Sequence, residues 1–88
     1  MDDTLSDALW GVFEEYDRAI KIHAQWPADP IHGAAIIAEE VGELVQACLQ
    51  AHYEPGALTL DDARREAVQV AVTALRFLVA TAETGGEA

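Results

Sequence analysis

The chain is organised around residues 38–44, which read Ala38-Glu39-Glu40-Val41-Gly42-Glu43-Leu44. Each residue of an α-helix advances by about 100°, so Glu40 and Glu43 project from one face and Glu39 lies on its outer edge. Beside these carboxylates the predicted helix carries an apolar stripe made by Ile37, Val41, Leu44 and Cys48. Carboxylates next to a packing face must be paired, protonated or bound to a cation, because burying an uncompensated charge is very costly.

The last predicted helix carries the second polar element. Its polar side chains recur at a three, four, three spacing and form one narrow stripe: Glu66, Gln69, Thr73 and Arg76. The helix is apolar on nearly every other side, which is typical of a helix buried on several sides. The stripe must therefore face something polar, and Glu40 with Glu43 is the obvious candidate. Three or four oxygen ligands from two antiparallel helices would form a hard-cation site suited to Mg²⁺ or Mn²⁺.

Composition limits both the fold and the partners. The 88 residues predict one small domain over residues 1–84, followed by a disordered tail at 85–88. A formal net charge of −11 argues against nucleic acid or an anionic membrane as a partner. The single cysteine, Cys48, excludes an intrachain disulfide and a Cys-rich zinc site, and we expect it to fill core space. With no signal-peptide pattern and no membrane-spanning apolar run, we expect a cytoplasmic protein.

The pattern predicts an all-α fold of three helices, near residues 4–24, 30–52 and 59–82, with the second and third antiparallel. Their starts are marked by two capping boxes and an Asp-Pro pair: Thr4 with Asp7, Thr59 with Asp62, and Asp29 with Pro30. The core stripe of the first helix is Leu5, Leu9, Val12, Tyr16 and Ile20, widened by Phe13.

The roles of one tryptophan and one glycine are not decided by the helical pattern. Trp10 lies on a different face of the first helix, where it forms either a subunit contact or a stacking surface for a base. Gly42 is expected to permit close approach of a neighbouring helix, although glycine costs about 1 kcal/mol against alanine in a helix. Residues 53–56, Tyr-Glu-Pro-Gly, have the chemistry of a turn.

Three basic or titratable residues are candidates for contact with an anionic ligand. His32 lies in the first turn of the second helix, where a protonated histidine is disfavoured, so we expect it to be neutral. It either donates a hydrogen bond to ligand or makes a local capping contact. Lys21 and Arg76 are candidate phosphate partners; a surface role is favoured for Lys21 and a binding role for Arg76. The sequence shows no nucleophilic triad and no glycine-rich phosphate loop.

These residues resemble the MazG-like branch of the all-α nucleoside triphosphate pyrophosphohydrolases, whose signature is EExxE on one helix and ExxD on the next. Residues 39–43 match the first part completely, in its Glu-Glu-x-Gly-Glu form. Residues 66–69 match the second part except that Gln69 stands where the family has aspartate. Trp26 and His32 are similar to the family's approach to its second helix, and the likeness covers most of the chain.

The resemblance implies Mg²⁺-dependent hydrolysis of a nucleoside triphosphate between its α and β phosphates, giving a nucleoside monophosphate and pyrophosphate. The implied metal ligands are Glu40, Glu43, Glu66 and Gln69. Glu39 would be a further ligand or would orient the attacking water. Together with the two positional candidates, the predicted substrate-binding residues are Trp26, His32, Lys21 and Arg76.

Gln69 is the departure from the motif that matters most. An amide oxygen can ligate a hard cation, but it brings no charge and cannot act as a base. Weaker metal binding, reduced activity or a different substrate is therefore expected. On this interpretation Gln69→Asp raises metal affinity, whereas Glu43→Gln abolishes metal binding and activity.

A homodimer or homotetramer is expected on two grounds. The resembled enzymes usually form shared helical bundles, and the third helix here presents apolar residues on two sides: Val68, Val72, Leu75 and Val79 on one, Val70 and Phe77 on the other. Oligomerisation is a common remedy for a small core. Two alternative functions remain, phosphoribosyl-ATP pyrophosphohydrolase activity and non-catalytic binding of nucleotide or metal by a helical oligomer.

Overall fold

The computed structural model describes residues 3–54 and 56–82 of the chain. These residues form three α-helices and no strand: α1 (Asp3–Ile22), α2 (Pro30–Tyr53) and α3 (Leu60–Ala80). The all-α prediction is confirmed, and the predicted boundaries lie within two residues of the observed ones. The tail predicted at 85–88 lies outside the described residues. None of the described helices is long and apolar enough to cross a membrane.

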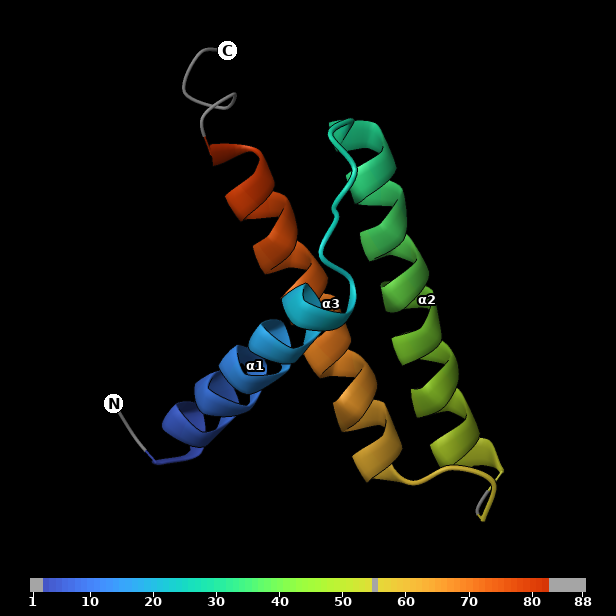
Figure 1. Ribbon diagram of the computed structural model, residues 1–88. Helices are drawn as coiled ribbons and strands as arrows, with labels where there is room; N and C mark the ends of the chain where they lie inside the picture. Colours follow the sequence, from blue (N-terminus) through green and yellow to red (C-terminus); the bar gives the residue numbers. More distant parts are fainter. Residues whose placement is uncertain (1–2, 55, 83–88) are drawn as a thin grey trace.

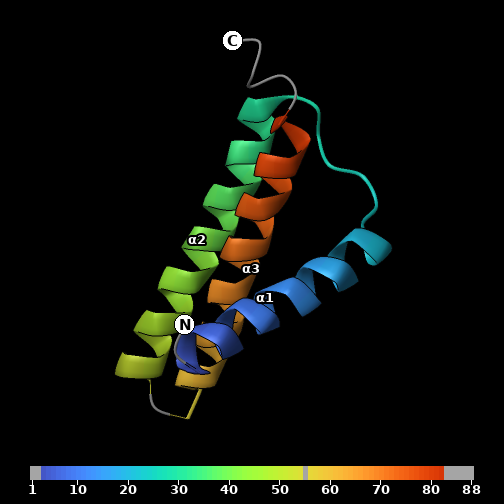
Figure 2. The same ribbon diagram turned by 90° about the vertical axis from the view of Figure 1, so that its left-hand side faces the viewer.

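Helices α2 and α3 lie side by side and run antiparallel (Figure 1). Helix α1 crosses α3 at a steep angle, as Figure 2 shows, and within the described part of the chain it contacts α3 but not α2. Residues 23–29, called here the α1–α2 connection, run back past α3 to the start of α2. Helix α3 therefore lies between the other two helices and carries most of the packing.

Local signals in the sequence account for the starts of α2 and α3. Asp29 Oδ1 accepts a hydrogen bond from the amide of Ile31 at 2.9 Å, and Pro30 occupies the first turn, as predicted. At α3, the Thr59 amide donates to Asp62 Oδ2 at 2.7 Å and the Asp62 amide donates to Thr59 Oγ1 at 3.3 Å. This reciprocal pair confirms the second predicted capping box.

The predicted capping box at the start of α1 is wrong. Asp3 is already helical, so Thr4 lies inside the helix rather than at its N-cap. Only a residue in a non-helical conformation at the N-cap can direct its hydroxyl oxygen to the amide three positions on. The Thr4–Asp7 spacing therefore occurs within the first turns of α1 and does not set its start.

The packing face of α2 includes only part of the predicted apolar stripe, since Ile37 and Leu44 are half-buried whereas Val41 and Cys48 are not. The face toward α3 is marked by the buried residues Gly33 and Ala47 and the half-buried Glu40 between them. Val41 is 41% exposed, and Cys48, predicted to fill core space, is also exposed. Small residues let two helix backbones approach closely, so the most buried positions of α2 are Gly33 and Ala47 rather than the bulkier stripe. Glu40 consequently lies on the packing face itself and not beside it.

Close helix approach depends on Gly33 and not on Gly42. A Cβ atom added at Gly33 would lie 3.1 Å from Phe77 Cδ2 and 3.2 Å from Trp26 Nε1. A Cβ atom added at Gly42 would meet nothing within 4 Å, so the prediction for Gly42 is wrong. Gly33 lets the α1–α2 connection place its indole directly against α2 and α3.

Uncovered apolar surface lies mainly on α1 and on the outer side of α2. No residue of α1 is buried, and most of its predicted core stripe is exposed, including Leu5, Leu9 and Ile20. Helix α3, in contrast, is covered on two sides, so of the apolar residues expected to remain open only Val79 is exposed, together with Leu60 and Leu78 at the two ends of the helix.

The overall dimensions agree with an incompletely covered chain. The accessible surface is 6483 Å², whereas a compact monomer of 9.5 kDa exposes about 5,000 Å². The radius of gyration is 14.8 Å, compared with about 12 Å for a compact domain of this length.

Candidate functional site

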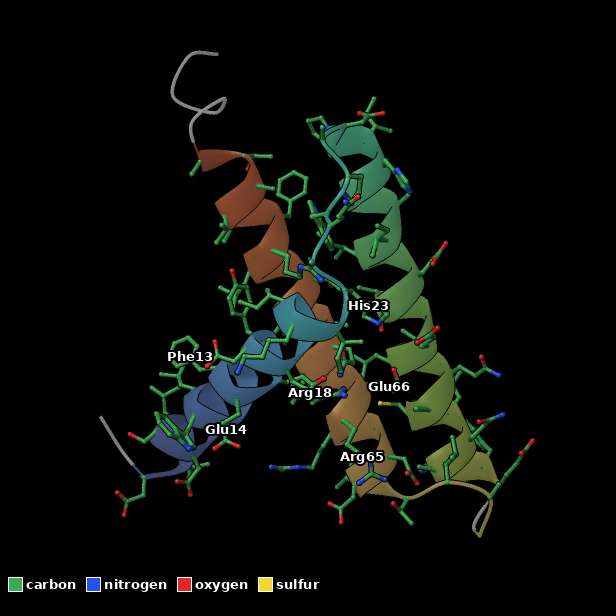
Figure 3. The ribbon with its side chains drawn as sticks, viewed as in Figure 1. Phe13, Glu14, Arg18, His23, Arg65 and Glu66 are labelled. Carbon is green, nitrogen blue, oxygen red and sulfur yellow. The ribbon has the colours of Figure 1, made fainter. Side chains whose placement is uncertain are left out.

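Three carboxylates from two helices form what we call the acidic triad: Glu40 and Glu43 from α2, and Glu66 from α3. One oxygen of each lies within 4.8 Å of one oxygen of both others. Glu40 and Glu66 are half-buried and Glu43 is exposed, so the triad opens to solvent on one side. Figure 3 shows Glu66 on α3 in the space toward α2. The predicted convergence of the two motifs is thus present in the fold.

The negative charges of the acidic triad are not neutralised by protein cations. Within residues 3–54 and 56–82, ion pairs join Arg18 to Glu15 and Arg65 to Asp62, and none reaches the triad. The pKa of Glu40 is raised, first by burial and then by the charges of Glu43 and Glu66. A hydrogen bond with Glu43 and the charge of Glu39 raise it further. Such mutual repulsion is relieved either by a proton or by a bound cation.

The donor set and spacing of the triad fit a hard divalent cation. Mg²⁺ binds oxygen ligands at about 2.0–2.1 Å, so two of its ligands lie roughly 3 to 4 Å apart. Oxygens within 4.8 Å of one another need only small side-chain rotations to reach that geometry. Carboxylate oxygens are also the ligands that Mg²⁺ and Mn²⁺ prefer. Glu39 is exposed beside the triad and is not one of its three members.

A cavity of about 320 Å³ adjoins the triad and is enclosed by all three helices and the α1–α2 connection. Four predicted site residues meet in its wall: Trp26, Glu40, Gln69 and Arg76. The remaining lining residues are Ala19, His23, Gln25, Pro27, Ile36, Val72 and Thr73. Glu40 belongs to both the cavity and the triad, so the two features form one continuous site.

His32 and Lys21 are not brought to this cavity. Both side chains are exposed, and neither lines it. A second cavity of about 330 Å³ lies between α1 and the first half of α3, but none of the predicted site residues lines it. Its charged residues are Asp7 and Arg64, one on each helix. The predicted site residues therefore meet in the cavity beside Glu40 and not in this second cavity.

Arg76 is the buried cation of the site. Its Nη2 donates to the carbonyl oxygens of His23 at 2.5 Å and Gln25 at 3.3 Å. Its guanidinium carbon lies 5.2 Å from the ring centroid of Trp26, within the range of a cation–π interaction. Arg76 therefore ties the α1–α2 connection to α3, a structural task that the sequence did not reveal. It has no carboxylate partner among the described residues.

The stack of Trp26 and Arg76 also separates two hollows. A smaller cavity of about 190 Å³ on its other side is lined by the same pair with Tyr16, Ile20, Ala24, Val79 and Ala80. Thr73, next along the polar stripe, is buried and donates its hydroxyl to the carbonyl oxygens of Gln69 or Val70, each at 3.0 Å. Its hydrogen bond is thus satisfied within α3.

Gln69 has an unexpected partner on α1. Its Nε2 donates to Glu15 Oε1 at 3.0 Å, and Glu15 is itself held by Arg18, whose Nη2 lies 2.5 Å from the same oxygen. The pKa of Glu15 is lowered by these bonds, that with Arg18 having the larger effect and that with Gln69 the smaller. Sequence reasoning missed Glu15, although it stands between Val12 and Tyr16 on the inner side of α1.

Comparison with protein-family models, with curated proteins and with solved structures gives no significant match in any of the three. Inferences about the function of this chain therefore depend on the geometry of its own residues.

Proposed function

We propose that this protein is a divalent-cation-dependent nucleoside triphosphate pyrophosphohydrolase of the MazG-like type. The observation that carries this proposal is the position of Glu40, which belongs to the acidic triad and also to the wall of the cavity that holds Arg76 and Trp26. A cation site, a buried guanidinium and an aromatic surface thus adjoin one another. A nucleotide with its metal-bound phosphates requires these three chemistries side by side.

Glu40, Glu43 and Glu66 would hold Mg²⁺ or Mn²⁺, with the amide oxygen of Gln69 as a fourth ligand. The metal, when bound, supplies a Lewis acid for the phosphates and lowers the pKa of a bound water. Glu39, exposed beside the triad, can accept a hydrogen bond from the attacking water and orient it toward the phosphorus. Hydrolysis between the α and β phosphates then yields a nucleoside monophosphate and pyrophosphate.

Arg76 and Trp26 would bind the nucleotide. Of the three guanidinium nitrogens of Arg76, only Nη2 donates hydrogen bonds to the described residues. The Nε and Nη1 groups are not sealed from solvent, so they are available to a phosphate oxygen. The cavity of about 320 Å³ is within the size range of small-molecule sites, and Glu40 joins it to the triad. We expect the nucleoside to lie in the cavity and the phosphates to extend toward the triad. We assign no binding role to His32 or Lys21, because both are exposed and neither lines the cavity.

We further propose that the active form is a homodimer or homotetramer. The support is the amount of apolar surface left open in one chain, chiefly on α1 and the outer side of α2. Large apolar patches of this kind are unusual on monomers and typical of subunit interfaces.

The decisive experiment is a nucleotide panel with and without Mg²⁺, in which pyrophosphate and nucleoside monophosphate are measured together. The proposal expects metal-dependent release of both products in equal amounts. Glu43→Gln should lower the rate at least about a hundredfold, because it removes one metal ligand. Glu14→Gln, which removes the same charge from an exposed site on α1, is the matched control and should leave the rate unchanged. Absence of metal-dependent turnover on every nucleotide would overturn the enzymatic proposal.

One observation favours a second candidate, a non-catalytic binder of metal or nucleotide. Gln69 cannot act as a base, and its amide nitrogen is already engaged by Glu15. Nucleotide binding by calorimetry without any turnover would identify this case. Phosphoribosyl-ATP belongs in the same panel, because turnover of that compound alone would identify the other pyrophosphohydrolase alternative.

A further inference from the structure

Gln69, which lines the same cavity as Glu40 of the acidic triad, is connected to α1 through one hydrogen-bonded chain. Arg18 donates to both oxygens of Glu15, with its Nε at 3.1 and 3.0 Å, and Glu15 Oε1 accepts from Gln69 Nε2. The Glu15 side chain is only 20% exposed, whereas that of Arg18 is 62% exposed. The Glu15 carboxylate thus contacts the Gln69 amide on its inner side and the Arg18 guanidinium on its outer side. These two contacts fix its position and favour its charged form.

This chain determines how the Gln69 amide is oriented. An ionised carboxylate accepts hydrogen bonds and cannot donate them, so Gln69 must present its nitrogen to Glu15. The carbonyl oxygen is then on the other branch of the amide group. That oxygen is the only atom of this side chain able to ligate a cation, and Gln69 lines the same cavity as Glu40.

We propose that Glu15 is a positioning residue for the metal site: it fixes the Gln69 amide with its oxygen free for the cation, and it supplies from α1 the negative charge that glutamine lacks. This inference depends on the proposed function, since it assigns a fourth acidic group to the same site. Groups that hydrogen-bond to metal ligands orient them and raise their basicity, and their removal typically weakens metal binding about ten- to a hundredfold.

The proposal explains why a glutamine stands at position 69. An aspartate there would place a second carboxylate against Glu15, and two like charges in a half-buried contact repel each other. The total negative charge around the metal is then kept, because Glu15 on α1 supplies the charge that Gln69 on α3 lacks. Metal affinity in this chain depends on α1 being docked, although α1 contributes no residue to the triad.

Substitution of Glu15 by glutamine separates charge from hydrogen bonding. Glu15→Gln keeps an oxygen that can accept from Gln69 but removes the charge. Glu14→Gln is the matched control, because it changes the net charge equally at an exposed neighbouring position that Figure 3 shows well separated from Glu66. The double variant Glu15→Gln/Gln69→Glu exchanges the two groups, which restores both the charge and a hydrogen bond of the opposite direction.

The measurements are Mn²⁺ titration calorimetry and the melting temperature without metal, on the full chain. We expect Glu15→Gln to weaken Mn²⁺ binding about tenfold or more, Glu14→Gln to bind like wild type, and the double variant to recover wild-type affinity or exceed it. A contact that only docks α1 would lower the melting temperature of Glu15→Gln and leave its Mn²⁺ affinity equal to that of Glu14→Gln. That result would overturn the inference while the proposed metal site stands.

Two further outcomes are equally decisive. If wild type gives no Mn²⁺ heat, the metal site and the role of Glu15 both fail. If the double variant binds Mn²⁺ as weakly as Glu15→Gln despite its restored charge, the charge at this contact does not act on the metal and the inference is overturned.

Discussion

Helices α2 and α3 pack on each other through small buried side chains, whereas α1 buries none of its residues. Ala47 and Ala63 are fully enclosed between α2 and α3, together with Val72, and this pair carries the whole acidic triad. Among the described helices, α1 contacts only α3, through a few polar and half-buried side chains. Its apolar side chains are mostly open to solvent.

The difference distinguishes the acidic triad, our proposed cation site, from the cavity proposed to bind the nucleotide. The three carboxylates of the triad come from α2 and α3, and the one contact of α1 that we propose to act on the cation is that of Glu15 with Gln69. The cavity needs α1 as well, since Ala19 and the α1–α2 connection form part of its wall. Binding of a cation and binding of a nucleotide should therefore respond differently to changes in α1.

Arg76→Ala should detach the α1–α2 connection from α3. It leaves the carbonyl groups of His23 and Gln25 without their donor and removes the stack on Trp26, which should cost about 2–4 kcal/mol of unfolding free energy. Arg65→Ala, at an exposed ion pair on the same helix, should cost less than about 0.5 kcal/mol. Urea unfolding of both variants provides the measurement, and equal costs would show that Arg76 does not hold the connection.

Phe13→Ser should weaken self-association more than it weakens the fold of one chain. Phe13 is 50% exposed on α1, and burying an aromatic side chain at an interface contributes about 1.5–3 kcal/mol. The dissociation constant of the oligomer should rise about tenfold or more in sedimentation equilibrium. Asp17→Ser, at an exposed polar residue of the same helix, is the control and should change it little. A wild-type chain that sediments as a monomer at micromolar concentration would contradict the oligomer proposal.

The stability of the metal-free protein should fall as pH rises above the ordinary glutamate pKa. Burial and repulsion raise the pKa of Glu40 in the folded state, so folding takes up a proton and is favoured at low pH. That contribution is complete below the unfolded pKa of about 4.5 and is lost as pH rises through the folded pKa. Mn²⁺ should cancel this slope and raise the melting temperature, since it binds only the folded state.

Glu40→Gln is the variant that checks this assignment. It should remove both the pH dependence and the response to Mn²⁺, because the titrating group and a metal ligand are the same carboxylate. Thermal melts from pH 4 to pH 8 measure both effects. A pH slope that persists in Glu40→Gln would show that another group titrates. The assignment of the pH dependence to the triad on the α2–α3 pair would then be wrong.

The smallest effect is expected at two glycines of α2. Gly42→Ala should stabilise the protein by about 1 kcal/mol, because the added methyl group meets nothing and alanine is the better helix former. Gly33→Ala should fail to give this gain, since its Cβ lies 3.1–3.2 Å from Phe77 and Trp26. Chemical unfolding of both variants tests the difference. An equal gain at both sites would mean that Trp26 shifts freely and does not close the cavity.

Local signals in the sequence were sufficient for the helices and for the triad. The Asp29-Pro30 pair and the Thr59–Asp62 box mark helix starts because their hydrogen bonds close within a few residues. The triad was predictable because Glu66 stands on an otherwise apolar helix, where a carboxylate must meet a polar surface. The helix starts depend on spacing within one helix, and the triad combines two such spacings on neighbouring antiparallel helices.

Features that depend on three-dimensional proximity were missed. The packing face of α2 was predicted only in part. Apolar periodicity counts large side chains, whereas Gly33 and Ala47 determine how closely α3 approaches. The partners of Arg76 are backbone carbonyls in the α1–α2 connection, and every residue type has such a carbonyl. Glu15 reaches Gln69 from 54 positions away along the chain, and no local pattern marks that pairing.

The turn between α2 and α3 has a consequence for the order of events during folding. Only residues 54–59 separate the two helices, and Gly56 adopts a φ of 99° that favours a tight reversal. Contacts between helices joined in this way close small loops and form early, before the longer-range docking of α1. We therefore expect the carboxylates of the triad to meet before α1 docks, so that their repulsion slows folding. A cation at the proposed site should then accelerate folding as well as slow unfolding, and a chelator should lower the refolding rate.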